Sequence, residues 1–324
     1  MGWFGRRHSR DGSTEPVAAQ PDPGLPMFPD GARAARFASL AMRVFAEHGI
    51  ECSYDDGFLR GSDGRSYGLT NVALVAAAGT DRHWRELLEQ HVGGIVAAHA
   101  TPRQRDLEAV GDRLYLRLWA AADLPHRPDG VNGFGEPLGE GLVGLAAIDH
   151  PEHVETLTGG HDIGLLGGWD VVRRTALANL AALRADDVVP LGDDPHSQVQ
   201  LSIGGFFNAS RVFTMERLLR EDFLLEEPSH GVLLVVPNRH LVAVHPLRSA
   251  GMVEAVHTLT RLARAESEVP GGISPHVWFW RDGWVEQVTR SAEEPDTVEL
   301  HVAGLLEVAM RELDLVEDPG DSGT

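Results

Sequence analysis

The chain has 324 residues, and 28 basic against 48 acidic residues give a formal net charge of −20 at pH 7. Every basic residue is Arg, and the absence of Lys excludes a Walker A phosphate loop, Schiff-base chemistry and the β3 lysine of a protein kinase. The single cysteine, Cys52, excludes an internal disulfide and any CxxC zinc or redox motif.

Charge and hydropathy also limit the classes of partner that the chain is expected to bind. The acidic balance disfavours nucleic acid, because phosphate backbones are bound by clustered positive charge. No apolar run reaches the ~18 residues of a transmembrane helix, and the N-terminus lacks the apolar region of a signal peptide. Trp3 and Phe4 beside Arg6, Arg7 and Arg10 allow contact with an anionic membrane surface, although we favour a disordered basic leader. We expect a cytoplasmic protein without a cofactor.

The first half of the chain is predicted to contain short hairpins and amphipathic helices. Asp56-Gly57 and Asp63-Gly64 mark hairpin turns, because Asp-Gly suits the positive φ of a type I′ turn. Apolar periodicity predicts the other elements. They are helices over residues 33–48, 81–98 and 169–184 and strands near 112–119 and 142–149.

The second half repeats a hairpin followed by a helix. Strands 231–236 and 240–245 flank the turn Pro237-Asn238-Arg239, and a helix near 249–265 follows. Strands 276–281 and 284–288 flank Asp282-Gly283, and a helix near 298–313 follows. Hairpins pair antiparallel, so the predicted fold class is α+β, with antiparallel sheets built from repeated hairpin-then-helix units and helices on one face. The strand Val232–Val236 is apolar on both faces, which predicts a central position.

Composition predicts four segments. They are a disordered Pro-rich leader (1–30), an N-terminal α+β domain (31–188), a C-terminal α+β domain (196–313) and an acidic tail (314–324). Asp186–His196 is rich in Asp and Pro, which is typical of a linker between the two domains.

Several short motifs follow one another along the chain in the same order as in a known family. They are Leu138–Leu142 (LGEGL) leading to Asp149, then Ala176–Leu180 (ALANL), then Val235–His240 (VVPNRH). With the element order over roughly 33–290, they resemble the YtpQ-type family of uncharacterised bacterial proteins. The long Pro-rich leader departs from that family's pattern. The resemblance implies an intracellular α+β protein and supplies no catalytic residues.

One helix carries a polar residue inside its apolar stripe. Val172, Ala176 and Leu180 form the stripe, and Asn179 falls within it. A buried amide must find hydrogen-bond partners. We therefore predict that Asn179 ties the helix to a neighbouring loop or strand edge, and a ligand-facing amide is the alternative.

The densest metal-like cluster lies between Asp149 and Asp162. His150 and His153 would share a face if this segment were helical, and imidazoles with carboxylates suit zinc or iron. We favour a structural interpretation, with Pro151 in the first position of a helix and its acidic neighbours complementing the helix N-terminus. We therefore expect no metal, and His150 and His153 remain the weak candidates.

The hairpin over 276–288 is the most aromatic segment. A two-residue turn pairs Arg281 with Trp284 and Trp280 with Val285, which places Trp278 and Trp280 on one strand face. Two such side chains form either a binding platform or the contents of a core. We favour the core, because the helix that follows needs a surface to cover.

The turn at Pro237-Asn238-Arg239 also favours a structural role, because Asn is common in tight turns. Its functional argument is that Arg239 can clamp a carboxylate or a phosphate. The candidate binding residues of the sequence are therefore Asn179, Asn238, Arg239, Trp278 and Trp280.

These patterns favour a non-enzymatic protein-interaction module, which binds another protein through the aromatic hairpin or an exposed sheet edge. The motivation is that no nucleophile–base set, phosphate loop or convincing metal motif appears in the sequence. The alternative is a hydrolase that uses His, Asp and Glu side chains from residues 149–162.

Overall fold

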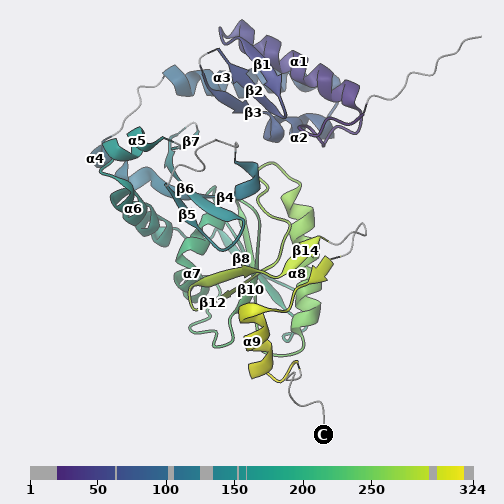
Figure 1. The fold of residues 1–324 in the computed structure, drawn as a ribbon, viewed down its shortest axis with the longest axis vertical. Coiled ribbons are helices and arrows are strands. Elements are labelled where there is room, and N and C mark those ends of the chain that lie inside the picture. The colour runs from purple at the N-terminus through teal and green to yellow at the C-terminus, as the bar shows by residue number, and fades with distance from the viewer. Residues whose placement is uncertain are drawn as a thin grey trace, which may run out of the picture. The chain divides into compact units, whose positions relative to one another are not determined.

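The fold is α+β, with antiparallel sheets and helices packed on them (Figure 1). The computed structural model describes residues 20–316 except 63, 101–105, 125–133, 152, 158 and 292–297. The chain divides into two compact units after Val96. Trp3, Phe4 and the last residues of the acidic tail, which bear on the predictions above, lie outside the described residues.

The N-terminal unit is a three-stranded antiparallel sheet with helices. Its elements are α1 (Gly31–Glu47), β1 (Cys52–Asp55), β2 (Phe58–Gly61), β3 (Ser66–Gly68), α2 (Thr70–Ala78), η1 (Asp81–His83) and α3 (Trp84–Ala100). The Asp30 carboxylate caps α1 by accepting a 2.9 Å hydrogen bond from the Ala32 amide. Asp56 and Gly57 have φ angles of 45° and 80°, as the Asp-Gly turn between β1 and β2 requires.

The predicted leader is partly ordered. Leu25 and Phe28 are fully buried in the core of the N-terminal unit, and the ring of Phe28 lies 5.3 Å from that of Phe37 and 5.6 Å from that of Trp84. The prediction of disorder over 1–30 is therefore wrong for these residues. The prolines around them suggested a tether, but two large apolar side chains gain enough by burial to order the segment.

The C-terminal unit begins with a four-stranded sheet in which β6 pairs with β4, β5 and β7. Its elements are α4 (Leu107–Val110), η2 (Gly111–Arg113), β4 (Leu114–Ala120), η3 (Ala121–Asp123), β5 (Gly135–Pro137), β6 (Leu142–Asp149), β7 (Val154–Thr156), α5 (Gly160–Leu165) and α6 (Trp169–Ala182). The stripe of α6 predicted from the sequence is confirmed, because Val172, Ala176 and Leu180 are buried.

A six-stranded antiparallel sheet follows, with the order β13-β12-β10-β11-β9-β8. Its elements and neighbours are β8 (Asp187–Leu191), β9 (Val199–Ile203), η4 (Ala209–Thr214), α7 (Met215–Glu221), β10 (Val232–Asn238), β11 (Leu241–Pro246), α8 (Met252–Ser267), β12 (Trp278–Arg281), β13 (Trp284–Gln287), β14 (Thr289–Ser291), β15 (Val298–Leu300) and α9 (Gly304–Glu312). Strand β10 is central and buried along its whole length, as predicted.

Alternation along the central strands assigns their side chains to two cores. Leu233 and Val235 lie in a core that also holds Met252 of α8 and Leu306 of α9. The alternate residues of β10, which are Val232, Leu234 and Val236, lie in a second core with side chains of η4 and α7. This core also contains two leucines of the four-stranded sheet, Leu118 and Leu142. The second core therefore joins the four-stranded and six-stranded sheets of this unit.

The segment predicted as a linker is instead part of the large sheet. Strand β8 pairs with β9 from Asp187↔Ile203 to Leu191↔Val199. Asp and Pro suggested a loop, but β8 is an edge strand, where Pro190 is tolerated because one side of the strand needs no ladder hydrogen bonds. The linker prediction for Asp186–His196 is wrong for this reason.

The end of α7 stores backbone strain at Leu224. Its φ angle is 54° and its side chain is 82% exposed. The next amide, of Leu225, donates to the Leu219 carbonyl at 2.9 Å, so the chain turns back over the end of the helix at Leu224. Glycine is the residue that adopts this conformation without a Cβ penalty.

We expect Leu224→Gly to raise the free energy of unfolding by about 0.5–1 kcal/mol. The substitution removes a penalty of about 1–2 kcal/mol for the left-handed conformation, and the greater entropy of the unfolded glycine chain offsets part of this gain. Leu224→Ala is the matched control and brings no such gain, since Ala keeps its Cβ. Urea unfolding of the three proteins measures the difference. Equal stabilities of the Gly and Ala variants would contradict the interpretation.

Candidate anion-binding site

An ion pair lies buried beneath the site. Arg211 of η4 donates to both carboxylate oxygens of Asp222, which follows α7, at 2.5 and 2.7 Å. Both side chains are only 3% exposed. The bidentate geometry suits the planar guanidinium, and it offsets the cost of removing two charges from water.

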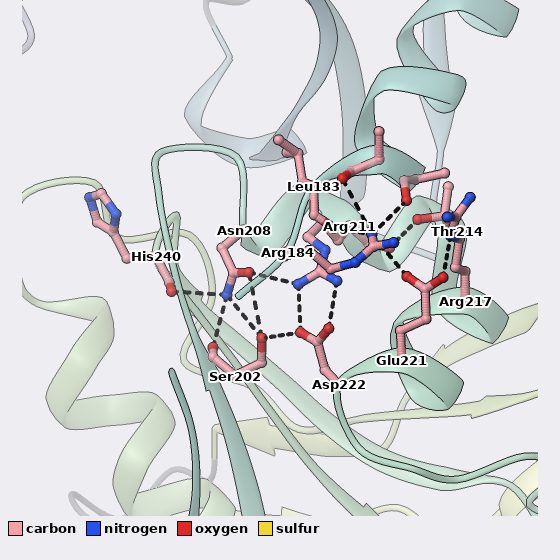
Figure 2. A network of polar contacts seen from close by, with 12 residues as sticks. Leu183, Arg184, Ser202, Asn208, Arg211, Thr214, Arg217, Glu221, Asp222 and His240 are labelled. Atoms are coloured by element: carbon pink, nitrogen blue, oxygen red, sulfur yellow. Dashed lines mark hydrogen bonds and ion pairs between the residues drawn. The ribbon is translucent and has the colours of Figure 1, made fainter. Parts of the chain in front are cut away.

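Two more side chains complete this buried network (Figure 2). The Ser202 hydroxyl of β9 donates to Asp222 at 2.8 Å, and the Asn208 amide oxygen accepts from Arg211 at 3.2 Å. The Asn208 amide nitrogen donates to the carbonyls of Ser202 at 2.8 Å and His240 at 3.1 Å. The network therefore connects β9, η4, the end of α7 and the turn between β10 and β11.

Backbone hydrogen bonds fasten the loop 204–208 to that turn. The Gly204 amide donates to the His240 carbonyl at 3.0 Å, and the Ala209 amide donates to the Arg239 carbonyl at 3.0 Å. His240 returns a bond from Nδ1 to the Gly204 carbonyl at 3.1 Å. Phe206 lies in the middle of this loop, so its ring is placed beside the turn.

Strand β4 is held against the same loop. The Leu118 amide donates to the buried Ser210 hydroxyl oxygen at 2.9 Å, and the Tyr115 ring stacks on Phe207 with centroids 4.4 Å apart. Successive side chains of a strand point to opposite faces. The leucines of β4 are buried, so Arg117 and Trp119 lie on the other face of the strand.

Two arginines meet at Phe206, and we call Arg117 and Arg239 the arginine pair. The guanidinium carbon of Arg117 lies 5.1 Å from the Phe206 centroid and 3.9 Å from that of Trp119. That of Arg239 lies 4.7 Å from Phe206. Each cation–π contact contributes about 0.5–2 kcal/mol. All four side chains are half-buried, so the cluster is neither sealed in the core nor free in solvent.

The arginine pair carries uncompensated charge. Within residues 20–316 as described, neither guanidinium forms an ion pair; Arg117 donates to the Thr156 hydroxyl at 3.3 Å, and Arg239 donates from Nε to His240 Nε2 at 2.9 Å. Burial, together with the charge of Arg239, lowers the pKa of Arg117 to about 10, and burial lowers the pKa of Arg239. Both shifts follow from burial, which disfavours the charged form of a guanidinium group.

A further donor beside the pair has no acceptor. The indole Nε1 of Trp119 is buried without a hydrogen-bond partner in the part of the chain that the structure describes. Among the described residues, the two guanidinium groups thus meet without a negatively charged acceptor. An anion is the ligand that would satisfy them, because it brings both charge and acceptor oxygens.

The tryptophans of the aromatic hairpin do not contribute an exposed platform. Trp278 and Trp280 are 1% and 7% exposed and lie in the core between the two sheets. The predicted register is confirmed, with Arg281↔Trp284 and Trp280↔Val285. Their role as candidate binding residues is corrected for a physical reason: the face they share packs against η4 and α7. Trp284 at the tip is 72% exposed instead.

Asn238 supports the turn from inside rather than presenting itself to a ligand. It is 5% exposed, pairs with Leu241 at the end of β10, and accepts a 2.9 Å bond from the His240 amide. The irregularity between Val235 and Asn238 shifts the turn by one residue from the predicted Pro237-Asn238-Arg239. Arg239 and His240 therefore form its tip.

Asn179 has the structural role predicted for it. Its amide nitrogen donates to the carbonyls of Gly111 at 2.6 Å and Leu114 at 2.7 Å. These bonds tie α6 to the start of β4. Asn179 thereby holds the strand that carries Arg117.

The histidines of the metal-like cluster lie in a turn. His150 and His153 exchange backbone hydrogen bonds between β6 and β7, and their rings stack with centroids 4.6 Å apart. The predicted helix start at Pro151 is therefore wrong, because the residues on both sides pair as strands. In the described ranges, no group of three His, Cys, Asp or Glu side chains is arranged to hold a metal ion.

The N-terminal unit offers a shallow open hollow of about 460 Å³. It is lined by Ala35, Arg36, Ser39, Leu40, Arg43, Asp81 and Trp84. Its carboxylate, Asp81, already binds Arg33 at 2.9 Å and Arg36 at 3.5 Å. Arg36 and Arg43 of its lining are exposed, so water solvates their charges, whereas Arg117 and Arg239 are half-buried.

Sequence reasoning found Arg239 and missed its neighbours. Arg117 is the one charged residue within the run Leu114–Ala120, and an arginine at a strand position that should face a partner was an available signal. Phe206 and the pair Arg211–Asp222 lie in a segment without clear periodicity, so only the folded chain brings them together.

Comparisons with known proteins do not assign this chain to a family. No family model matches the chain, and neither a search of curated proteins nor one of solved structures found a match. The resemblance to the YtpQ-type family stays a prediction. No helix of the described residues is long and apolar enough to cross a membrane.

We expect Asp222→Asn to lower the free energy of unfolding by about 3–5 kcal/mol, because it leaves the buried Arg211 charge without a counter-charge. Glu221→Gln is the matched control; its partners Arg184 and Arg217 are exposed, so about 1 kcal/mol or less is lost. Urea unfolding measures both. Equal losses would show that the buried pair holds the fold no more than its surface neighbour does.

Asn179→Asp tests the hydrogen bonds that tie α6 to the start of β4. The exchange keeps the side-chain shape and replaces a double donor by a carboxylate that faces two carbonyl oxygens. We expect a loss of about 2 kcal/mol or more in the free energy of unfolding at pH 7, because both carbonyls lose their donor. Unchanged stability would mean that water satisfies them in the folded protein.

Proposed function

We propose that this chain is a non-enzymatic protein-interaction module that holds an anionic group of a partner protein on the arginine pair. The observation that carries the proposal is that Arg117 and Arg239 share the ring of Phe206 without a carboxylate partner in the described residues. Half-buried cations in this state gain most from an external anion.

The composition of the cluster supports a protein partner. Arg and large aromatic side chains are the residues that most often dominate protein–protein binding energies. Phe206, Trp119 and the arginine pair are all half-buried, which leaves each of them surface for a contact. The loop and turn that carry them are braced by the Arg211–Asp222 network, so little conformational freedom is lost on binding.

The other surfaces named by the sequence support the proposal less. The aromatic hairpin offers Trp284 alone, since Trp278 and Trp280 are core residues. The edge strand β8 exposes Val188 and Leu191, but Pro190 has no amide hydrogen to offer to an added strand. For the hydrolase alternative, the described residues around His150 and His153 hold no group of three side chains that could bind a metal ion.

Thermal unfolding with probe anions tests the site. Acetate and inorganic phosphate are added to the full chain, with chloride at matched ionic strength as the reference. We expect at least one probe to stabilise the protein, by about 2.7 kcal/mol at a hundredfold excess over its Kd, because ligands that bind only the folded state stabilise it by mass action.

Three variants make the test specific. Arg117→Gln and Arg239→Gln should each abolish the stabilisation by the probe anion. Arg220→Gln changes the net charge equally at an exposed position of α7 and should keep it. The proposal fails if chloride stabilises the wild type as much as both probes do, or if Arg220→Gln loses the effect as well.

A further inference from the structure

The charge of the arginine pair points to a particular class of anion. Two half-buried guanidinium groups lie at one aromatic ring, and the burial of each works against its own charge. A carboxylate carries one negative charge and would leave one cation without a counter-charge. A phosphate monoester carries about −1.5 to −2 at pH 7 and matches both.

The hydrogen-bond donors of the cluster also favour a phosphate over a carboxylate. Arg239 uses its Nε for His240, which leaves its two terminal nitrogens for a ligand. Arg117 has one weak bond to Thr156, and Trp119 Nε1 has no acceptor in the described part of the chain. The guanidinium nitrogens that remain on the two arginines suit the three acceptor oxygens of a phosphate monoester better than the two oxygens of a carboxylate.

We infer that the arginine pair binds a phosphorylated side chain within a basic segment of the partner protein. This inference rests on the proposed function and names its ligand. The phosphate places its charges and acceptor oxygens at the guanidinium groups of Arg117 and Arg239, while the basic flanks face the rest of the molecule.

The net charge of −20 decides between the possible carriers of the phosphate. A nucleic acid or an anionic membrane presents many phosphates, and the field of this chain repels them. A single phosphate on an Arg-rich peptide meets the arginine pair locally and is attracted to the protein as a whole. Basic protein segments are therefore the carriers that fit both the site and its surroundings.

Fluorescence anisotropy on the full chain tests the inference. The probes are labelled peptides of Gly, Ser and Arg whose central residue is phosphoserine, phosphotyrosine, Glu or Ser. We expect a phosphopeptide to bind at least tenfold more tightly than the Glu and Ser peptides. Arg117→Gln and Arg239→Gln should each weaken it at least tenfold, and Arg220→Gln should not.

A phosphopeptide with Asp in place of its Arg flanks should bind more weakly than the basic one, and inorganic phosphate should displace both. Thermal unfolding of each variant without ligand shows that the fold is intact, and Arg239→Gln keeps the inference testable if Arg117→Gln fails to fold. Arg239→Lys, which keeps the charge and loses the planar fork, should retain part of the affinity.

Different outcomes distinguish a failure of the phosphate inference from a failure of the proposed function. If the Glu peptide binds as tightly as the phosphopeptides and both need the arginine pair, the proposed function stands and the phosphate inference is wrong. If neither the peptides nor the probe anions bind, both are wrong. Tighter binding of a single-stranded oligonucleotide or of anionic vesicles through the same arginines would overturn the choice of a protein carrier.

Discussion

The salt bridge between Arg211 and Asp222 is the interaction on which the C-terminal unit depends. Two charges are almost completely removed from water, and besides each other each has a further side-chain partner in the same network, Asn208 for Arg211 and Ser202 for Asp222. The pair therefore permits one arrangement of β9, η4, the end of α7 and the turn after β10, because any other leaves a charge unpaired in the interior. The loop that carries Phe206 takes its place from this constraint (Figure 2).

Beside that loop, two other arginines have the opposite charge balance. Arg211 is buried and neutralised, whereas Arg117 and Arg239 are half-buried and, in the ranges the structure describes, carry no counter-charge. The first arrangement holds the fold together. The second leaves positive charge at a rigid place on the surface, which costs stability unless a ligand supplies the missing charge. That contrast is the physical basis for assigning recognition to the arginine pair and support to the ion pair.

Sequence patterns predicted most of the hairpins because their signals are local. The Asp282-Gly283 turn set the register of Trp280 against Val285, and the unbroken apolar run Val232–Val236 placed β10 in the middle of its sheet. Asn179 was predicted to tie its helix to a neighbouring segment, since a polar residue in an apolar stripe must find partners. Strand β8 was missed because its Asp and Pro residues resemble a loop, and pairing with β9 outweighs that local preference.

The sequence by itself determined the α+β class, the antiparallel hairpins, the apolar faces and an overall charge that disfavours polyanions. Those properties follow from residue periodicity, turn chemistry and composition, which need no knowledge of distant contacts. Only the tertiary structure decided that Trp278 and Trp280 fill a core and that Arg117 meets Arg239 at Phe206. Burial and charge balance depend on which segments face each other, and three segments far apart along the chain come together at this site through the folding of two sheets.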